Sequence, residues 1–347
     1  MKQYKSLDLA KFICALMIIV LHTAPFLSYS KILTFGFRNI VTVIAVPFFF
    51  LVSGFLAFKK LDGLDSVGRR RYIKRYATRL GVMYLVWSAV YFVFVAIKWY
   101  LFGFDFSMVL VYIRDFFFEG SYSTIWFLPA LLSATLIVYL LHKKLSYKAI
   151  FVLSCIVYLF TLGGSSYYGL VTKLPALETV YNVYYSIFDT VKNGVCFGML
   201  FVSMGAMISA HETRIIQKTT SKRAFVPVSV FALLLAAEAV FVEYMDWNSK
   251  GVDTVIMLVP FTFFFVRFLL TVDIKISNNL CVTMRKYSIL MFLCQRIPMS
   301  IIEIFMSESI IAENSLLFFI TVLVATAAIA FVIIKCSKKL KFLKYVY

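Results

Sequence analysis

The chain contains ten apolar runs of about the length needed to cross a lipid bilayer as a helix. A hydrocarbon core of about 30 Å needs about 20 apolar helical residues, with a lower limit of about 17. The runs cover residues 7–27, 39–58, 80–101, 125–142, 149–163, 193–210, 224–242, 253–272, 287–306 and 315–334. The fifth run is the shortest. We therefore predict an all-α integral membrane protein built as a bundle of ten transmembrane helices.

The composition supports a membrane protein and argues against a nucleic-acid-binding one. Of 347 residues, 62% are hydrophobic and 15% charged, whereas soluble domains are about half apolar and a quarter charged. The net charge of +18 lies in short loops between the runs, where basic residues orient helices and contact anionic lipid headgroups. We expect membrane lipids, and no nucleic acid, as partners. The six cysteines show no Cys-x-x-Cys spacing, which predicts neither a disulfide framework nor a metal site.

The connecting segments alternate in charge along the chain. The basic set comprises residues 2–5, 59–79, 143–148, 214–223, 275–286 and 335–344. The opposite set is poor in Lys and Arg and holds acidic residues such as Asp105, Glu119 and Asp253. By the positive-inside rule, both termini are cytoplasmic. A missed or extra span would break this alternation, so the pattern favours an even count of ten.

Lys11 and His22 are ionisable residues inside the first apolar run, LDLAKFICALMIIVLHTAPFL. They are eleven residues apart, so at about 100° per residue they fall on nearly the same helix face. An ionisable group in hydrocarbon costs about 3 kcal/mol or more unless it faces water or a partner. We take both as candidate functional residues, with His22 as a general base near neutral pH. Alternatively, Lys11 reaches the interface and His22 makes a helix–helix hydrogen bond.

Further polar side chains lie in the later runs. Gln295, Arg296 and Glu303 belong to the ninth run, and Lys192 and Asn193 precede the sixth. Arg296 and Glu303 are seven residues apart on one helix face, which predicts either an ion pair within the helix or a pair linked through water. Because several runs carry such groups, we predict a shared polar cavity that binds a small molecule through these residues. Pairing that only neutralises buried charge is the alternative for each of them.

Three features predict particular contacts. Arg267 in the eighth run and Glu238 in the seventh are expected partners across the bundle. In the second run, Ser53-Gly54 permits close helix approach. Two segments between runs, at residues 102–124 and 162–194, are longer than a tight turn needs. The first predicts an amphipathic interfacial helix, and the second either such a helix or a lid over an outer cavity.

The motifs resemble those of the acyltransferase-3 family of ten-span membrane proteins. The matching residues are Leu7-Asp8, Lys11 and His22 in the first run, Phe48-Phe49-Phe50 with Ser53-Gly54 in the second, Arg75 and Arg79 before the third, and Trp126-Phe127-Leu128. The resemblance implies His22 and Lys11 as catalytic residues, Trp126 at the substrate site, and Arg75 with Arg79 holding the phosphates of acyl-coenzyme A. The basic side chains of Arg75 and Arg79, one helical turn apart, also suit lipid phosphates.

The chain also departs from the family pattern. Lys11 replaces an arginine, Thr124 replaces the histidine before the Trp-Phe-Leu signature, and Gln295 replaces a ninth-span histidine. Segments such as LGGSSYYGL resemble a subgroup, the membrane domains of VanT-type serine racemases of vancomycin-resistant Gram-positive bacteria. In that subgroup a cytoplasmic racemase domain with pyridoxal phosphate follows the last span and makes D-serine. We therefore expect residues 1–347 to be one membrane domain in a plasma membrane, with the racemase domain and its cofactor beyond residue 347.

Three functional hypotheses follow. The leading one is uptake or delivery of L-serine to an attached or partner racemase domain, because a zwitterion needs a cation for its carboxylate and an acceptor for its ammonium group. The second is acyl transfer from acyl-coenzyme A to an acceptor, with His22 as general base. The third is a membrane anchor without its own chemistry.

Overall fold

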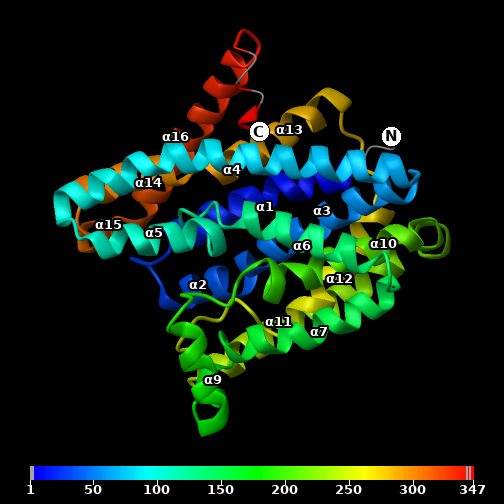
Figure 1. Ribbon diagram of the computed structural model, residues 1–347, viewed down its shortest axis with the longest axis horizontal. Coiled ribbons are helices and arrows are strands. Elements are labelled where there is room, and N and C mark those ends of the chain that lie inside the picture. The colour runs from blue at the N-terminus through cyan, green and yellow to red at the C-terminus, as the bar shows by residue number, and fades with distance from the viewer. Residues whose placement is uncertain (1–3, 341–342, 344) are drawn as a thin grey trace. The chain divides into compact units, whose positions relative to one another are not determined.

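The computed structural model describes residues 4–340, 343 and 345–347, which form helices and no strands (Figure 1). Seven helical stretches among them are long and apolar enough to cross a bilayer. They are Lys5–Thr23 (α1), Lys31–Asp62, Ser66–Phe102 (α4), Gly194–Gln217, Ser221–Tyr244 (α11), Asn278–Phe305 and Ser315–Cys336 (α16). The prediction of an all-helical, multi-pass membrane protein is confirmed.

Three shorter apolar helices coincide with the remaining predicted runs. They are α6 (Phe127–Leu141), α7 (Tyr147–Gly163) and α12 (Leu258–Thr271). At 14 to 17 residues they fall below the length of the seven long stretches. Ten crossings and two cytoplasmic termini therefore stay predictions. Lys2, Lys341 and Lys344, which belong to the charge pattern, lie outside the described residues.

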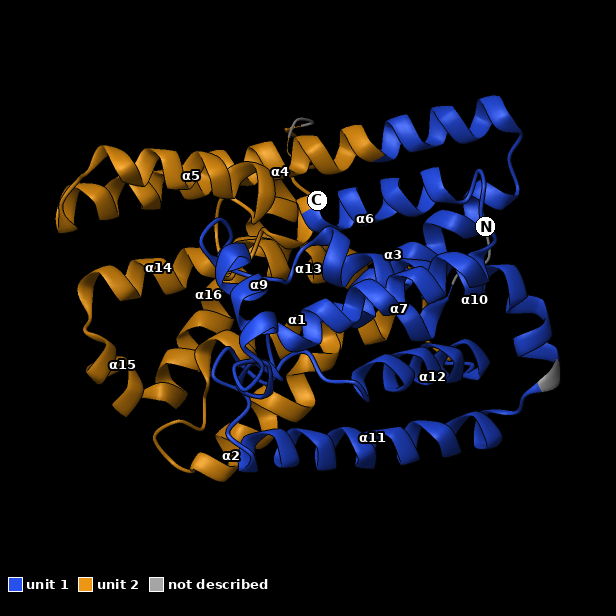
Figure 2. Ribbon diagram, turned by 60° about the horizontal axis from the view of Figure 1, so that its bottom comes forward, with its two compact units in different colours: residues 1–7, 46–76, 130–274 blue, residues 8–45, 77–129, 275–347 orange. Residues whose placement is uncertain are grey.

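The chain forms two compact units, each assembled from separate stretches (Figure 2). Unit 1 comprises Met1–Leu7, Val46–Tyr76 and Ala130–Ile274. Unit 2 comprises Asp8–Ala45, Ala77–Pro129 and Lys275–Tyr347. The long helix α4 is continuous over 37 residues, and its sequence contributes to both units.

In unit 1, helix α3 (Ala45–Asp62) and helix α10 (Met199–Lys218) cross with their backbones almost in contact. A Cβ atom added to Gly54 would lie 2.5 Å from the carbonyl oxygen of Val202. One added to Gly205 would lie 2.2 Å from the carbonyl oxygen of Leu51. Two glycines thus face each other's helix, and the close approach predicted from Ser53-Gly54 is confirmed.

Helices α7 and α12 of unit 1 pack against α10. Helices α11 and α12 lie side by side (Figure 2). The other helical elements are α8 (Tyr168–Val171), α9 (Pro175–Tyr185) and the π-helix η3 (Gly194–Gly198) that leads into α10. Tyr181 on α9 donates to the carbonyl of Phe160 at 2.8 Å and stacks on its ring at 4.7 Å. The second long outer segment therefore packs its tyrosine-rich face on the end of α7.

Unit 2 contains most of α1 and helix α5 (Phe106–Phe118), which confirms a helix within residues 102–124. The hydroxyl of Tyr84 on α4 donates to the carbonyl of Phe116 on α5 at 2.6 Å. The other elements are α2 (Lys31–Gly36), η1 (Phe37–Val41), η2 (Thr42–Ile44), α13 (Asn278–Cys294), α14 (Arg296–Phe305) and α15 (Glu308–Glu313). Both α13 and α14 pack against α16.

Candidate functional site

The ten residues singled out from the sequence divide between the two units. Unit 1 holds Arg75, Lys192 and Asn193. Unit 2 holds Lys11, His22, Arg79, Trp126, Gln295, Arg296 and Glu303. Seven of the ten residues therefore belong to unit 2.

The ninth apolar run is interrupted in unit 2, where α13 ends at Cys294 and α14 begins at Arg296. Pro298 explains the interruption, because its ring nitrogen carries no hydrogen to donate to the carbonyl of Cys294, four residues earlier. The hydroxyl of Tyr91 on α4 donates to the neighbouring carbonyl of Leu293. Interrupted backbone inside a membrane is stable where protein groups satisfy it or where it lines a cavity, and many transporters bind substrate at such breaks.

Arg296 and Glu303 form the predicted ion pair. Nη1 of Arg296 donates to Oε1 of Glu303 at 2.9 Å and Nη2 donates to Oε2 at 3.1 Å, a two-point contact. Nζ of Lys98 lies 3.6 Å from the same carboxylate. The guanidinium of Arg296 also lies 5.8 Å from the ring centre of Tyr122, whose hydroxyl hydrogen-bonds that of Ser300 at 2.6 Å. The pair thus neutralises charge and fixes the start of α14.

Four buried polar atoms around this break make no hydrogen bond of good geometry among the described residues. They are Oγ1 of Thr124, Oε1 of Gln295, Nε of Arg296 and Oγ1 of Thr326. Gln295 is fully buried, and its amide nitrogen donates to the carbonyl of Phe292 at 3.1 Å. Each unpaired buried group costs about 1–3 kcal/mol. We name these four residues the break cluster.

Neighbouring residues contact the members of the break cluster. The thiol of Cys294 lies 3.8 Å from the carbonyl oxygen of Thr326, and Thr124 lies beside the hydroxyl of Tyr91. The ring of Tyr91 stacks on that of Tyr122 at 4.6 Å, with the planes 4° apart. The cluster offers one cationic donor, one amide acceptor and two hydroxyl groups, which is a donor set for a small polar molecule.

Lys11 lies one turn after Asp8 on α1, and Asp8 forms a different ion pair with a residue of α13. Oδ2 of Asp8 lies 3.3 Å from Nε of Arg285 on α13, and the Asp8 side chain is buried. Lys11 is half-buried and within electrostatic range of both. This placement gives Lys11 a carboxylate neighbour inside the first span, as a buried cation requires.

His22 is exposed in the last turn of α1. Just beyond it, the carbonyl of Pro25 accepts a hydrogen bond of 3.1 Å from Ser315 at the start of α16. Thr326 of the break cluster stands eleven residues further along α16, about 16 Å at a rise of 1.5 Å per residue. A chamber shared by His22 and the break cluster would have to extend over that distance, and its existence stays a prediction.

Lys192 and Asn193 make contacts that hold unit 1 together. Oδ1 of Asn193 accepts hydrogen bonds of 2.9 Å from the backbone N–H groups of Val195 and Cys196, so Asn193 caps η3. The ammonium group of Lys192 pairs with the carboxylate of Asp253. The sequence did not predict the pairing of Lys192 with Asp253, because these residues lie in segments far apart in the chain.

The prediction that Glu238 pairs with Arg267 is wrong. The Glu238 carboxylate accepts hydrogen bonds from Tyr167 and, at 2.7 Å each, from the backbone N–H groups of Ile256 and Met257. Glu238 therefore binds the backbone just before α12, whereas Arg267 lies in the later half of α12. A carboxylate at one end of α12 is too far to reach a guanidinium near the other end.

Trp126, Arg75 and Arg79 occupy helix ends and surfaces. Trp126 is half-buried directly before α6, and a Cβ atom on Gly120 would lie 2.4 Å from its Cα. Gly120 has φ +95, which favours glycine at this turn. Arg75 and Arg79 are exposed on α4.

Comparison with known proteins now identifies the family. The Acyl_transf_3 model, described as an acyltransferase domain, matches residues 4–335. The chain belongs to the acyltransferase-3 family. No solved structure gives a significant match to it.

Relatives of this acyltransferase-3 domain carry racemase names. An amino-acid racemase from Enterococcus faecalis is 28% identical over 345 residues, which cover 98% of this chain and 46% of the relative. A serine/alanine racemase from Enterococcus gallinarum is 26% identical over 263 residues, 76% of this chain and 36% of the relative. The resemblance to VanT-type racemases is confirmed at this modest identity. The chain spans less than half the length of these relatives.

A further charged cluster in unit 1 of the acyltransferase-3 domain had no signal in the sequence. The ammonium group of Lys59 contacts both the buried carboxylate of Glu212 and the hydroxyl of Tyr4. Tyr4 in turn donates to Oε1 of Glu212 at 2.7 Å. Burial and the adjacent Glu212 carboxylate raise the pKa of Tyr4 above its usual value, so its hydroxyl keeps its proton and donates.

Removing the cation from this cluster tests its contribution to stability. We expect Lys59→Met to lower the free energy of unfolding by about 1–3 kcal/mol, because the buried Glu212 carboxylate loses its charged partner. Lys60→Met is the matched control: Lys60 is exposed, and its ammonium group lies 5.3 Å from the ring centre of Tyr72, so a loss of less than about 1 kcal/mol is expected. Equilibrium unfolding in mixed micelles measures both. Equal losses would contradict a role for the cluster.

Proposed function

We propose that this domain takes up L-serine or delivers it to a racemase domain of the same or a partner chain. The matched relatives are named amino-acid racemase and serine/alanine racemase, and more than half of each relative's length lies outside the match. The acyltransferase-3 histidine before the Trp-Phe-Leu signature is Thr124 here, and the ninth-span histidine is Gln295. Two of the positions that depart from the family pattern thus belong to the break cluster.

The single observation that carries the proposal is the break cluster at the α13–α14 interruption. L-serine presents a carboxylate, an ammonium group and a hydroxyl. Nε of Arg296 can donate to the carboxylate, and Oε1 of Gln295 can accept from the ammonium group. The hydroxyls of Thr124 and Thr326 can hydrogen-bond the serine hydroxyl. Because Glu303 already holds both terminal nitrogens of Arg296, the substrate would meet the third guanidinium nitrogen, Nε, which is unpaired.

Serine uptake into proteoliposomes that contain the full chain tests this proposal. We expect Gln295→Met and Thr124→Val to lower the initial uptake rate at least tenfold, because each removes a group whose hydrogen bond to a polar substrate is worth about 1–3 kcal/mol. Thr135→Val is the matched control: Thr135 is also a fully buried threonine with an unpaired hydroxyl, but it lies on α6 in unit 1. Its uptake should equal that of the wild type.

Two results would contradict this function. One is serine uptake no greater than that of protein-free liposomes. The other is an equal loss in Thr124→Val and Thr135→Val, which would indicate a general packing defect. Protein quantity in the vesicles and thermal stability of each variant must be measured in parallel, so that a folding defect is separated from a transport defect.

Acyl transfer is the second candidate, because the family match is to an acyltransferase domain and His22 is exposed at the end of α1. In this function His22 removes the proton of an acceptor hydroxyl as it attacks the acyl carbonyl, and coenzyme A leaves as the thiol. Arg75 and Arg79 would hold the cofactor's phosphates. Coenzyme A release from acetyl-coenzyme A that is lost in His22→Ala, with serine uptake absent, would favour this function over transport.

A further inference from the structure

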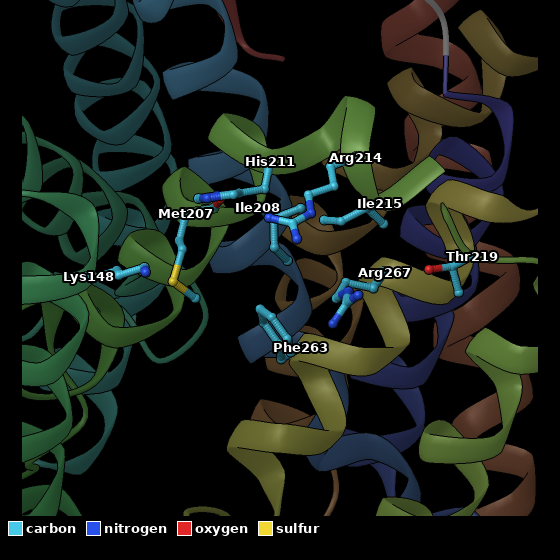
Figure 3. A pocket seen from close by; sticks show the side chains of 9 residues that line it. All are labelled: Lys148, Met207, Ile208, His211, Arg214, Ile215, Thr219, Phe263 and Arg267. Atoms are coloured by element: carbon cyan, nitrogen blue, oxygen red, sulfur yellow. The ribbon is translucent and has the colours of Figure 1, made fainter. Parts of the chain in front are cut away.

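A basic pocket lies in unit 1, lined by residues that do not belong to the break cluster. Its volume is about 330 Å³ (Figure 3). Three helices supply its basic side chains: Lys148 on α7, His211 and Arg214 on α10, and Arg267 on α12. Arg214 and Arg267 project from two neighbouring helices toward the space above Phe263 (Figure 3).

The positive charge of this pocket has no carboxylate to balance it. The residues that line the pocket include neither Asp nor Glu. Glu212, which follows His211 directly, is buried and held by Lys59 and Tyr4. Among the described residues, Arg267 contacts aromatic rings instead, with its guanidinium 5.4 Å from the centre of Phe263 and 5.7 Å from that of Phe264. The charged groups of Lys148, Arg214 and Arg267 line one pocket. Together they favour an anionic ligand.

The rest of the lining selects the kind of anion. Met207, Ile208, Ile215 and Phe263 give the pocket an apolar side, and Thr219 adds a hydroxyl. An anion that also carries a hydrocarbon chain matches both surfaces. Guanidinium groups bind phosphate oxygens through two parallel hydrogen bonds, and basic pockets between membrane helices bind acidic lipid headgroups.

The sequence position of the pocket agrees with a lipid ligand. Residues 143–148 and 214–223 belong to the segments whose charge predicts a cytoplasmic location, where anionic lipid is enriched. Arg267 belongs to the apolar helix α12. We propose that this pocket binds the phosphate of an acidic phospholipid.

Lipid binding to the purified full chain in a neutral detergent tests this proposal, with native mass spectrometry counting bound lipids. Phosphatidylglycerol is expected to bind at least tenfold more tightly than phosphatidylcholine. Arg214→Gln and Arg267→Gln should each weaken phosphatidylglycerol binding about tenfold, the effect of losing one charged hydrogen bond. Arg223→Gln is the control, because Arg223 is exposed nearby on α11 but does not line the pocket; it should bind like the wild type.

A soluble phosphate compound could occupy the same pocket in place of a lipid. A competition experiment distinguishes these two kinds of ligand. Coenzyme A added at equal concentration should leave the bound phosphatidylglycerol in place; its displacement of the lipid would overturn the lipid assignment. Equal binding of the two lipids, or unchanged binding in both arginine variants, would overturn the site. Because Arg214 is exposed, Arg214→Gln is expected to fold and to give a readable result even if Arg267→Gln does not.

Discussion

Replacing Gly205 with alanine is expected to remove about 3 kcal/mol or more from the free energy of unfolding. The new Cβ atom would lie 2.2 Å from the carbonyl oxygen of Leu51 and 2.5 Å from the backbone nitrogen of Phe55. Both are backbone atoms of α3, so a side-chain rotation cannot relieve the clash, and α3 and α10 must separate. Unfolding in mixed micelles, or the yield of folded protein after detergent extraction, measures the loss.

The same substitution at Gly81 is the matched control for this prediction. Gly81 lies within α4, and a Cβ atom there would meet nothing within 4 Å. Alanine is a better helix former than glycine by about 1 kcal/mol, so Gly81→Ala should be neutral or stabilising. Gly54→Ala, which faces Val202 across the same crossing, should behave like Gly205→Ala. A harmless Gly205→Ala would mean that α3 and α10 do not approach this closely.

Replacing Arg296 with methionine is expected to destabilise the domain by about 3 kcal/mol. Arg296 is 16% exposed and Glu303 27% exposed, so the substitution leaves a largely shielded carboxylate without its two-point partner. Glu303 would keep only Lys98, at 3.6 Å. The double variant Arg296→Met/Glu303→Met should recover most of the loss, because the one charge left without its partner is that of Lys98, which is 38% exposed.

Lys98→Met is the control for this pair. Lys98 is 38% exposed and contacts Glu303 at a longer distance, so a loss below about 1 kcal/mol is expected. The coupling between Arg296 and Glu303, from a double-mutant cycle in mixed micelles, should be about 2 kcal/mol. Additive single losses would show that the two side chains act separately and that the ion pair does not fix the start of α14.

Periodicity and burial cost were enough to predict several features from the sequence. Apolar run length gave the places of the helices, because hydrocarbon excludes unpaired backbone groups. The Arg296–Glu303 pair followed from spacing on one helix. The Gly54 contact followed from the small side chain at a position where helices approach. All three depend on neighbours within one helix or on properties of one residue.

Contacts between distant segments could not be predicted in the same way. Glu238 was expected to meet Arg267 because both lie in adjacent spans, yet its carboxylate accepts backbone N–H groups before α12 instead. Asn193, chosen as a substrate ligand, caps η3. The break cluster needed both Pro298, which is visible in the sequence, and the approach of Thr124 from the turn before α6 and of Thr326 from α16, which is not.

Equilibrium binding of radiolabelled L-serine to the purified full chain tests the central claim most directly, because it is independent of energy coupling and of any racemase domain. The account predicts saturable binding to the wild type and to Thr135→Val. It predicts binding at least tenfold weaker in Gln295→Met, which removes the only amide acceptor of the break cluster. Absence of saturable binding, or the same affinity in Gln295→Met as in the wild type, would contradict the account.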